Sequence, residues 1–155
     1  MRCLLTDKIT KCEKKASITG IKNVTMSENF LADHFPGFPV MPGVLQLEAV
    51  SQLGSWLVFA SSEHKKKARL SSVKSIKYKE FVVPGDQMRI EIKIRAYEET
   101  EAQFDAEIYV ADKLKTVIKR GTLSFVNVSD LEDPRKAKTH FNFISGNTPK
   151  GAYGG

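Results

Sequence analysis

Residues 43–60 predict a helix with very little polar surface, and this segment constrains the fold more than any other. Apolar side chains cover more than half of its circumference at about 100° per residue; they are Leu45, Leu47, Ala49, Val50, Leu53, Trp56, Leu57 and Val58. A helix as apolar as this is buried. The concave face of a sheet is the simplest cover for it.

Strands predicted elsewhere supply such a sheet. In the segment "QMRIEIKIRAYE" (87–98), apolar and charged residues alternate with a period of two, so one face is buried and the other meets water. Residues 102–110 repeat the pattern, and "EETE" between the two predicts a hairpin. Further strands are expected at 16–25, 70–83 and 115–128. One long helix with four or five strands, mostly in consecutive order, predicts an α+β fold with an antiparallel sheet.

The chain of 155 residues is expected to form one domain over residues 1–128. Residues 129–155 are polar and show little periodicity, which predicts a mobile C-terminal tail. Within this tail, the short apolar island Phe141–Ile144 could dock on the domain.

Composition excludes several classes of protein. No apolar run reaches the roughly 18 residues of a membrane span, and the first residues show no secretory signal. Two cysteines are too few for a disulfide framework and suit a reducing cytoplasm. The net charge of +6 favours a polyanionic partner. Nucleic acid is not expected, because the chain lacks a pattern of stacking aromatics or a recognition helix.

The predicted helix carries one narrow polar stripe. Glu48, Ser51, Gln52 and Ser55 follow one another at i, i+3, i+4 and i+7, so they share a face. A solvent-facing stripe is the simpler interpretation. The alternative is a polar cavity or interface, which fits better here because the stripe is narrow and has one charge. A partly desolvated carboxylate there can carry a proton at neutral pH and act as a general acid.

The segment "HFPGFPVMPG" (34–43) precedes this helix and concentrates prolines and glycines around one histidine. Such residues fix a loop against the helix start. The amide of Gly43 would be an unpaired donor in the first turn, and the helix dipole would help it stabilise an oxyanion. With His34 as a base and Glu48 as an acid, this corner would suit abstraction of a proton next to a carbonyl.

The segment "HFPGFPVMPGVLQLEAVSQ" closely resembles the signature of the (3R)-hydroxyacyl-acyl-carrier-protein dehydratases of the FabZ type. The segments "LLTDKI", "IKNVTMSENFLADHFPG" and "VKSIKYKEFVVPGDQMRIEI" extend the resemblance to roughly residues 4–126. The resemblance implies a hot-dog fold, in which an antiparallel sheet wraps around a long central helix.

The resemblance also implies the roles of individual residues. His34 would take the α-proton, Glu48 would protonate the leaving β-hydroxyl, and the Gly43 amide would polarise the thioester carbonyl. Gln52 would belong to the shell around Glu48. Phe35 and Val44 would contact substrate.

The implied partner is acyl carrier protein, which presents the substrate on its phosphopantetheine arm. The resemblance further implies a homodimer with a composite active site, and a trimer of dimers. It implies no metal or redox cofactor, and His64 and His140 have no partners at metal-binding spacing. The run Lys65-Lys66-Lys67 with Arg69 is either a solvated loop or part of a docking surface for the acidic carrier.

Two alternatives keep the same fold. A hot-dog acyl thioesterase would also place a carboxylate on the helix, but it does not need the corner that bears His34. A non-catalytic acyl-carrier-binding subunit would be expected to lack His34 or Glu48. The sequence departs from the family at Gln46, commonly an aliphatic position, and at Ser51, usually alanine, where the hydroxyl could adjust the hydrogen bonding of Glu48.

Overall fold

The computed structural model describes residues 4–25 and 39–146. Its sheet has six antiparallel strands in the order β1-β2-β4-β5-β6-β3. The strands are β1 (Lys8–Glu13), β2 (Ser17–Asn23), β3 (Lys66–Tyr78), β4 (Gln87–Tyr97), β5 (Glu101–Val110) and β6 (Lys113–Asn127). The expected α+β fold with an antiparallel sheet is confirmed. Strands β1 and β2 are consecutive neighbours, as are β4, β5 and β6, whereas β3 crosses to the far edge beside β6.

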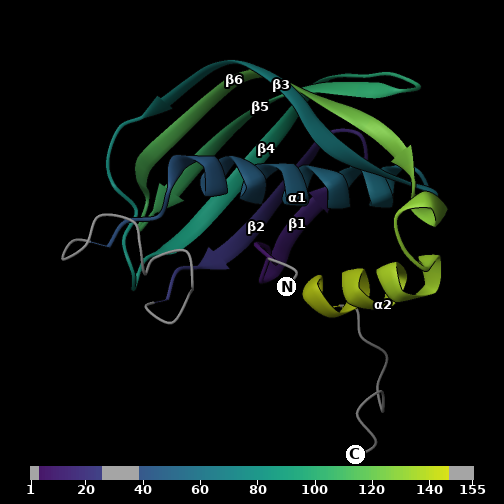
Figure 1. Cartoon of the computed structure of the whole chain (residues 1–155), viewed down its shortest axis with the longest axis horizontal. Coiled ribbons are helices and arrows are strands. Elements are labelled where there is room, and N and C mark those ends of the chain that lie inside the picture. The colour runs from purple at the N-terminus through teal and green to yellow at the C-terminus, as the bar shows by residue number, and fades with distance from the viewer. Residues whose placement is uncertain (1–3, 26–38, 147–155) are drawn as a thin grey trace, which may run out of the picture.

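Helix α1 (Gly43–Ser61) lies across the concave side of the sheet (Figure 1). Glycines allow the two layers to approach closely. A Cβ on Gly54 would lie 2.8 Å from a methyl carbon of Leu123 on β6, and one on Gly20 would lie 2.7 Å from a methyl carbon of Leu53. The buried helix predicted from its apolar circumference is therefore confirmed.

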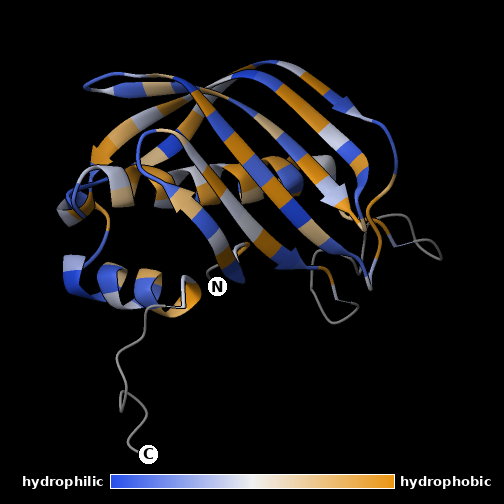
Figure 2. Cartoon of the chain, turned by 180° about the vertical axis from the view of Figure 1, so that it is seen from behind, coloured by the Kyte–Doolittle hydropathy of each residue, from blue (hydrophilic) through white to orange (hydrophobic). Residues whose placement is uncertain are grey.

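The period-two pattern of β4 also matches the structure. Met88, Ile90 and Ile92 are buried, and β4 pairs with β5 through the hairpin predicted at "EETE", where the Glu98 amide donates to the Glu101 carbonyl at 2.9 Å. Figure 2 shows the alternation as blue and orange bands along neighbouring strands. The buried face of this sheet meets α1.

Strands β5 and β6 bulge around Asp105. Arg120 has a φ of 54°, and its amide donates to the Asp105 carboxylate at 2.9 Å; the Arg95 guanidinium lies 2.9 Å from the other carboxylate oxygen. Burial raises the pKa of Asp105, but the Arg120 amide and Arg95 outweigh it, so the net pKa lies below its usual value. An ionised carboxylate therefore holds the bulge.

The C-terminal segment differs from the expected mobile tail. A short 3₁₀ turn, η2 (Val128–Asp130), leads into helix α2 (Pro134–Ile144), whose N-terminus is capped by Asp133 accepting from the Arg135 amide at 2.9 Å. Ala137, Phe141 and Ile144 are buried and join the same hydrophobic core as α1. Helix α2 lies beside the C-terminal part of α1, on the side away from the sheet (Figure 1). The apolar island does dock.

The remaining differences and expectations concern two strands, one short helical turn and membrane-spanning helices. Strand β1 was not predicted, and β3 begins four residues before the expected strand at 70–83. The short helical turn suggested by "SENFLADHF" lies outside the described residues. None of the helices in the described part of the chain is long and apolar enough to cross a membrane.

Candidate active site

Pro42 and Gly43 start α1 at one end of the sheet. The Pro42 carbonyl accepts from the Leu45 and Gln46 amides at 3.0 and 3.2 Å, so Pro42 serves as the N-cap. A Cβ on Gly43 would lie 2.6 Å from Cζ of the Tyr78 ring. A side chain at position 43 would have to displace the ring of Tyr78, which covers that position.

The segment before the helix is tied to the loop between β3 and β4 and, through Gln46, to strand β6. The Met41 amide donates to the Val82 carbonyl at 2.7 Å. The buried side chain of Gln46 donates from Nε2 to the Met41 carbonyl at 3.5 Å and accepts from the Thr116 hydroxyl at 2.6 Å. The unusual glutamine at position 46 thus pairs with a buried threonine on β6. It links the helix start to the sheet.

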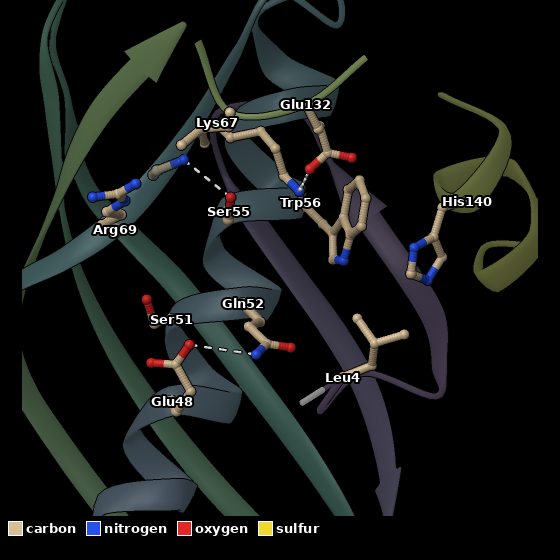
Figure 3. A pocket seen from close by; sticks show the side chains of 12 residues that line it. Leu4, Glu48, Ser51, Gln52, Ser55, Trp56, Lys67, Arg69, Glu132 and His140 are labelled. Carbon is tan, nitrogen blue, oxygen red and sulfur yellow. Dashed lines mark hydrogen bonds and ion pairs between the residues drawn. The ribbon is translucent and has the colours of Figure 1, made fainter. Parts of the chain in front are cut away.

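The polar stripe of α1 lines a pocket, which agrees with the interpretation of the stripe as part of a polar cavity. Gln52 donates from Nε2 to Oε1 of Glu48 at 3.3 Å (Figure 3). It also accepts from the Leu5 amide at 2.8 Å. The amide group of Gln52 is therefore fixed in one orientation, with its NH₂ toward the carboxylate. The expected neighbour relation of Glu48 and Gln52 is confirmed.

Ser51 and Ser55 bind the edge strand. The Ser51 hydroxyl accepts from the Leu70 amide, and the Ser55 hydroxyl accepts from the Ala68 amide, both at 3.0 Å. The suggestion that Ser51 adjusts the hydrogen bonding of Glu48 is not matched by any bond within the described residues. The expected desolvation of Glu48 is also absent from the single chain, where Glu48 is exposed.

The pocket has a volume of about 430 Å³ and lies between α1, β3 and the segment that leads into α2 (Figure 3). Glu48 and Gln52 lie at one end of the pocket, and the ion pair described below lies at the other end. Its lining residues are Leu4, Glu48, Ser51, Gln52, Ser55, Trp56, Lys67, Ala68, Arg69, Leu131, Glu132 and His140. Pockets of this size and with few converging polar groups are typical ligand sites.

Lys67 and Glu132 form an ion pair at the far end of this pocket. Their Nζ and Oε2 atoms are 3.2 Å apart, and Lys67 Nζ lies 3.9 Å from the centre of the Trp56 ring. The His140 ring meets the Trp56 ring edge to face at a centroid distance of 5.3 Å. This cluster was not predicted from the sequence, because Lys67 lies in a basic run that was expected to be exposed, and residues 132 and 140 lie in the expected tail.

The remaining predicted residues are placed as follows. Val44 is exposed in the first turn of α1, with 71% of its surface accessible. His34 and Phe35 lie outside the described residues, so their proximity to Glu48 stays a prediction. Within residues 4–25 and 39–146, no three His, Cys, Asp or Glu side chains are grouped closely enough to hold a metal ion.

Comparison with known proteins gives consistent results. The FabA-like domain family matches residues 1–118. A "3-hydroxyacyl-[acyl-carrier-protein] dehydratase FabZ" of Koribacter versatilis is 39% identical over 113 residues, which are 72% of this chain and 72% of that protein. The FabZ of Psychrobacter arcticus is 40% identical over 115 residues, which are 72% of this chain and 79% of that protein.

Two solved structures share the fold at low sequence identity. The dehydratase heterocomplex ApeI:P from Xenorhabdus doucetiae has a TM-score of 0.65 at 12% identity, covering 83% of this chain and 86% of that one. The smu.793 protein from Streptococcus mutans, bound to acetyl CoA, has a TM-score of 0.60 at 16% identity, covering 82% and 94%. These likenesses support the hot-dog architecture.

Proposed function

This chain belongs to the FabZ family of 3-hydroxyacyl-[acyl-carrier-protein] dehydratases, and on that premise we propose that it dehydrates (3R)-hydroxyacyl-acyl-carrier-protein in fatty-acid biosynthesis. The product is the trans-2-enoyl thioester. The observation that carries the proposal at the site is the Glu48 carboxylate, held by Gln52 at the mouth of a pocket on α1. Support for the thioesterase alternative is limited to fold likeness, as to thioesterase HI1161 from Haemophilus influenzae at a TM-score of 0.57 and 18% identity, covering 79% of each chain.

In the proposed reaction, two side chains move the protons. His34 removes the α-proton, and its electron pair forms the new carbon–carbon double bond as the β-carbon–oxygen bond breaks. Glu48 gives its proton to the leaving hydroxyl, which departs as water. Gln52 donates to Oε1 of Glu48, which leaves Oε2 to face the substrate. The Gly43 amide at the start of α1 polarises the thioester carbonyl.

Phe35 and Val44 are proposed to contact the substrate beside this amide. The mechanism assigns no step to a metal or redox cofactor, because both proton transfers are given to side chains. The acyl chain is carried by the phosphopantetheine arm of acyl carrier protein, which is the proposed partner in the cytoplasm.

Substitution of the two proton-transfer residues tests the function. We expect His34→Ala and Glu48→Gln each to lower the rate of dehydration by about 10²–10⁴-fold, the usual contribution of general acid–base catalysis. Formation of the conjugated enoyl thioester is followed by its absorbance. Glu99→Gln, an exposed carboxylate on the β4–β5 turn, is the matched control. Near-normal turnover by folded Glu48→Gln would remove Glu48 from the mechanism.

The proposed assembly is a homodimer in which His34 of one chain faces Glu48 of the other, and three such dimers form a hexamer. Two features of the single chain support this. Strand β3 ends the sheet, so a second copy can extend the sheet there. Glu48 is exposed in the single chain, so a partner can complete its surroundings.

Docking of the acidic carrier is proposed to use the exposed cations near the start of β3. Lys67 does not belong to this surface, because it is buried and paired with Glu132. Lys65 and Arg69 remain exposed. For carrier-linked substrate, kcat/KM should fall as salt rises, whereas a short pantetheine thioester should respond much less. Equal salt dependence of the two substrates would count against this surface.

A further inference from the structure

The candidate pocket extends well beyond the proposed acid. Glu48 and Trp56 both line it and are eight residues apart on α1, which is about 12 Å along a helix axis. Gln52 lies between them on the same face. A substrate whose β-carbon lies at Glu48 therefore has a defined space ahead of it for the rest of its acyl chain.

The sides of this space include apolar surface. Leu4 and Leu131 line it and are exposed by 50% and 40%, and Ala68 of β3 and the Trp56 ring complete the apolar surface. Methylene groups that cover these side chains would be removed from water at no polar cost. The first few carbons of an acyl chain thus fit the pocket.

The end of the space is charged. The Lys67 and Glu132 side chains are 10% and 15% exposed, and their ion pair lies directly on Trp56, with His140 behind the same ring (Figure 3). An alkyl chain that reached this pair would exclude its remaining water and return no hydrogen bond, which is unfavourable for charged groups. The pair is also fixed between β3 and the segment before α2.

We propose that the Lys67–Glu132 ion pair on Trp56 is the end wall of the acyl pocket and limits the length of the hydroxyacyl chain that the enzyme accepts. This inference rests on the proposed function. Glu132 and His140 lie beyond residue 118, where the match to the FabA-like domain family ends. The wall is therefore supplied in part by this chain's own C-terminal segment, and Lys67, Glu132 and Trp56 determine specificity without touching the reacting atoms.

A chain-length series tests the proposal. The carrier-linked substrates run from 3-hydroxybutyryl through 3-hydroxyoctanoyl to 3-hydroxyhexadecanoyl, whose chain beyond the β-carbon is longer than the roughly 12 Å between Glu48 and Trp56. For the wild-type protein, kcat/KM should fall by at least about tenfold once the chain exceeds the pocket, the scale on which a methylene group is discriminated. Equal or rising kcat/KM up to 3-hydroxyhexadecanoyl would overturn the proposal.

The double substitution Lys67→Met/Glu132→Leu tests the wall itself. Replacing both partners of a buried ion pair by apolar side chains usually preserves folding. The variant should gain at least about tenfold in kcat/KM on 3-hydroxyhexadecanoyl relative to 3-hydroxybutyryl. The matched control, Lys11→Met/Glu13→Leu, removes an exposed pair on β1 at 3.5 Å and should leave the chain-length profile unchanged. An unchanged profile in the Lys67→Met/Glu132→Leu variant would overturn the proposal.

A second variant acts in the opposite direction and does not touch the ion pair. Leu131→Trp adds volume at an exposed position in the pocket, so it should lower turnover of 3-hydroxyoctanoyl substrate more than that of 3-hydroxybutyryl. Equal effects on both chains would contradict the proposal. Absence of turnover on every substrate by the wild-type protein would instead refute the proposed function, and this inference with it.

Discussion

Phe141 on α2 offers a sensitive test of how the C-terminal helix is held. Its ring is 8% exposed and lies 5.7 Å from the centre of the Trp56 ring and 5.6 Å from that of Phe59. Ala137 and Ile144, which are also buried, lie on the same face of the helix. Phe141→Ala would remove the largest side chain that α2 contributes to this contact and leave a cavity beside α1.

The expected loss follows from the burial of this ring. Buried Phe→Ala substitutions cost about 3–5 kcal/mol. We expect about 3 kcal/mol for Phe141→Ala, at the lower end of that range, because a helix near the end of the chain can move to fill part of the cavity. At about 2–4 °C per kcal/mol for a domain of this size, Tm should fall by about 6–12 °C.

Urea and thermal unfolding of the full chain measure this loss. Phe143→Ala is the control, since Phe143 is two residues away on the same helix and 59% exposed. Its cost should stay within about 0.5 kcal/mol, as for most surface substitutions. If the two variants unfold alike, Phe141 does not pack on α1, and α2 does not belong to the core.

Three further predictions concern the buried polar pair, pH and assembly. Thr116→Val should lower the free energy of unfolding by about 1–3 kcal/mol, because it leaves the Gln46 amide oxygen buried without its donor. The double variant with Gln46→Leu should recover much of that loss in urea unfolding, and additive losses would contradict this. The lowered pKa of Asp105 makes its carboxylate stabilising above its unfolded pKa of about 3.9, and this stability is lost as pH falls through the lower folded value. Acid titrations of unfolding should therefore show a weaker pH dependence below about pH 4 in Asp105→Asn, and identical slopes would refute that assignment. Inactive His34→Ala and Glu48→Gln proteins, refolded together, should regain activity in mixed dimers, which would have one intact composite site; verified mixed dimers that stay inactive would place both residues within one chain.

The central helix and the middle strands could be predicted because their signals are local. Because apolar side chains cover more than half of the circumference of residues 43–60, a helix there must be buried. The alternation in β4 similarly predicts a strand with one buried face. Both patterns lie within a single segment, so no knowledge of the rest of the chain is needed. The structure differs from these predictions by a residue or so at the ends.

The sequence contains local signals for helix α2, although this segment was predicted to be a mobile tail. Asp133 followed by Pro134 is a typical helix start, and Ala137, Phe141 and Ile144 follow at i, i+4 and i+7. The overall polarity of the segment hid this narrow apolar face. Strand β1 was missed for a different reason, since Ile9 is its only fully buried residue and the alternation is too weak to detect.

The contacts of the candidate site also divide into those that could be predicted from the sequence and those that could not. Glu48 and Gln52 could be paired from sequence, because residues four apart on a helix are neighbours. The contact between Lys67 and Glu132 joins residues 65 positions apart, and it depends on where β3 and α2 pack. No local pattern specifies that arrangement. The role of His34 stays a prediction, carried by the resemblance of the segment that contains it.

The amides of Ala68 and Leu70 donate hydrogen bonds to the serines of α1. The first part of edge strand β3 therefore has fewer free amides than the rest of the strand. An edge strand normally offers its free amides as a template on which other chains can polymerise. At the start of β3, helix hydroxyls already occupy those donors, so templated growth is blocked there. Along β3, another strand can therefore pair only beyond the irregularity at Leu70–Ser72. Such a half-closed edge favours a finite assembly over an open-ended fibre.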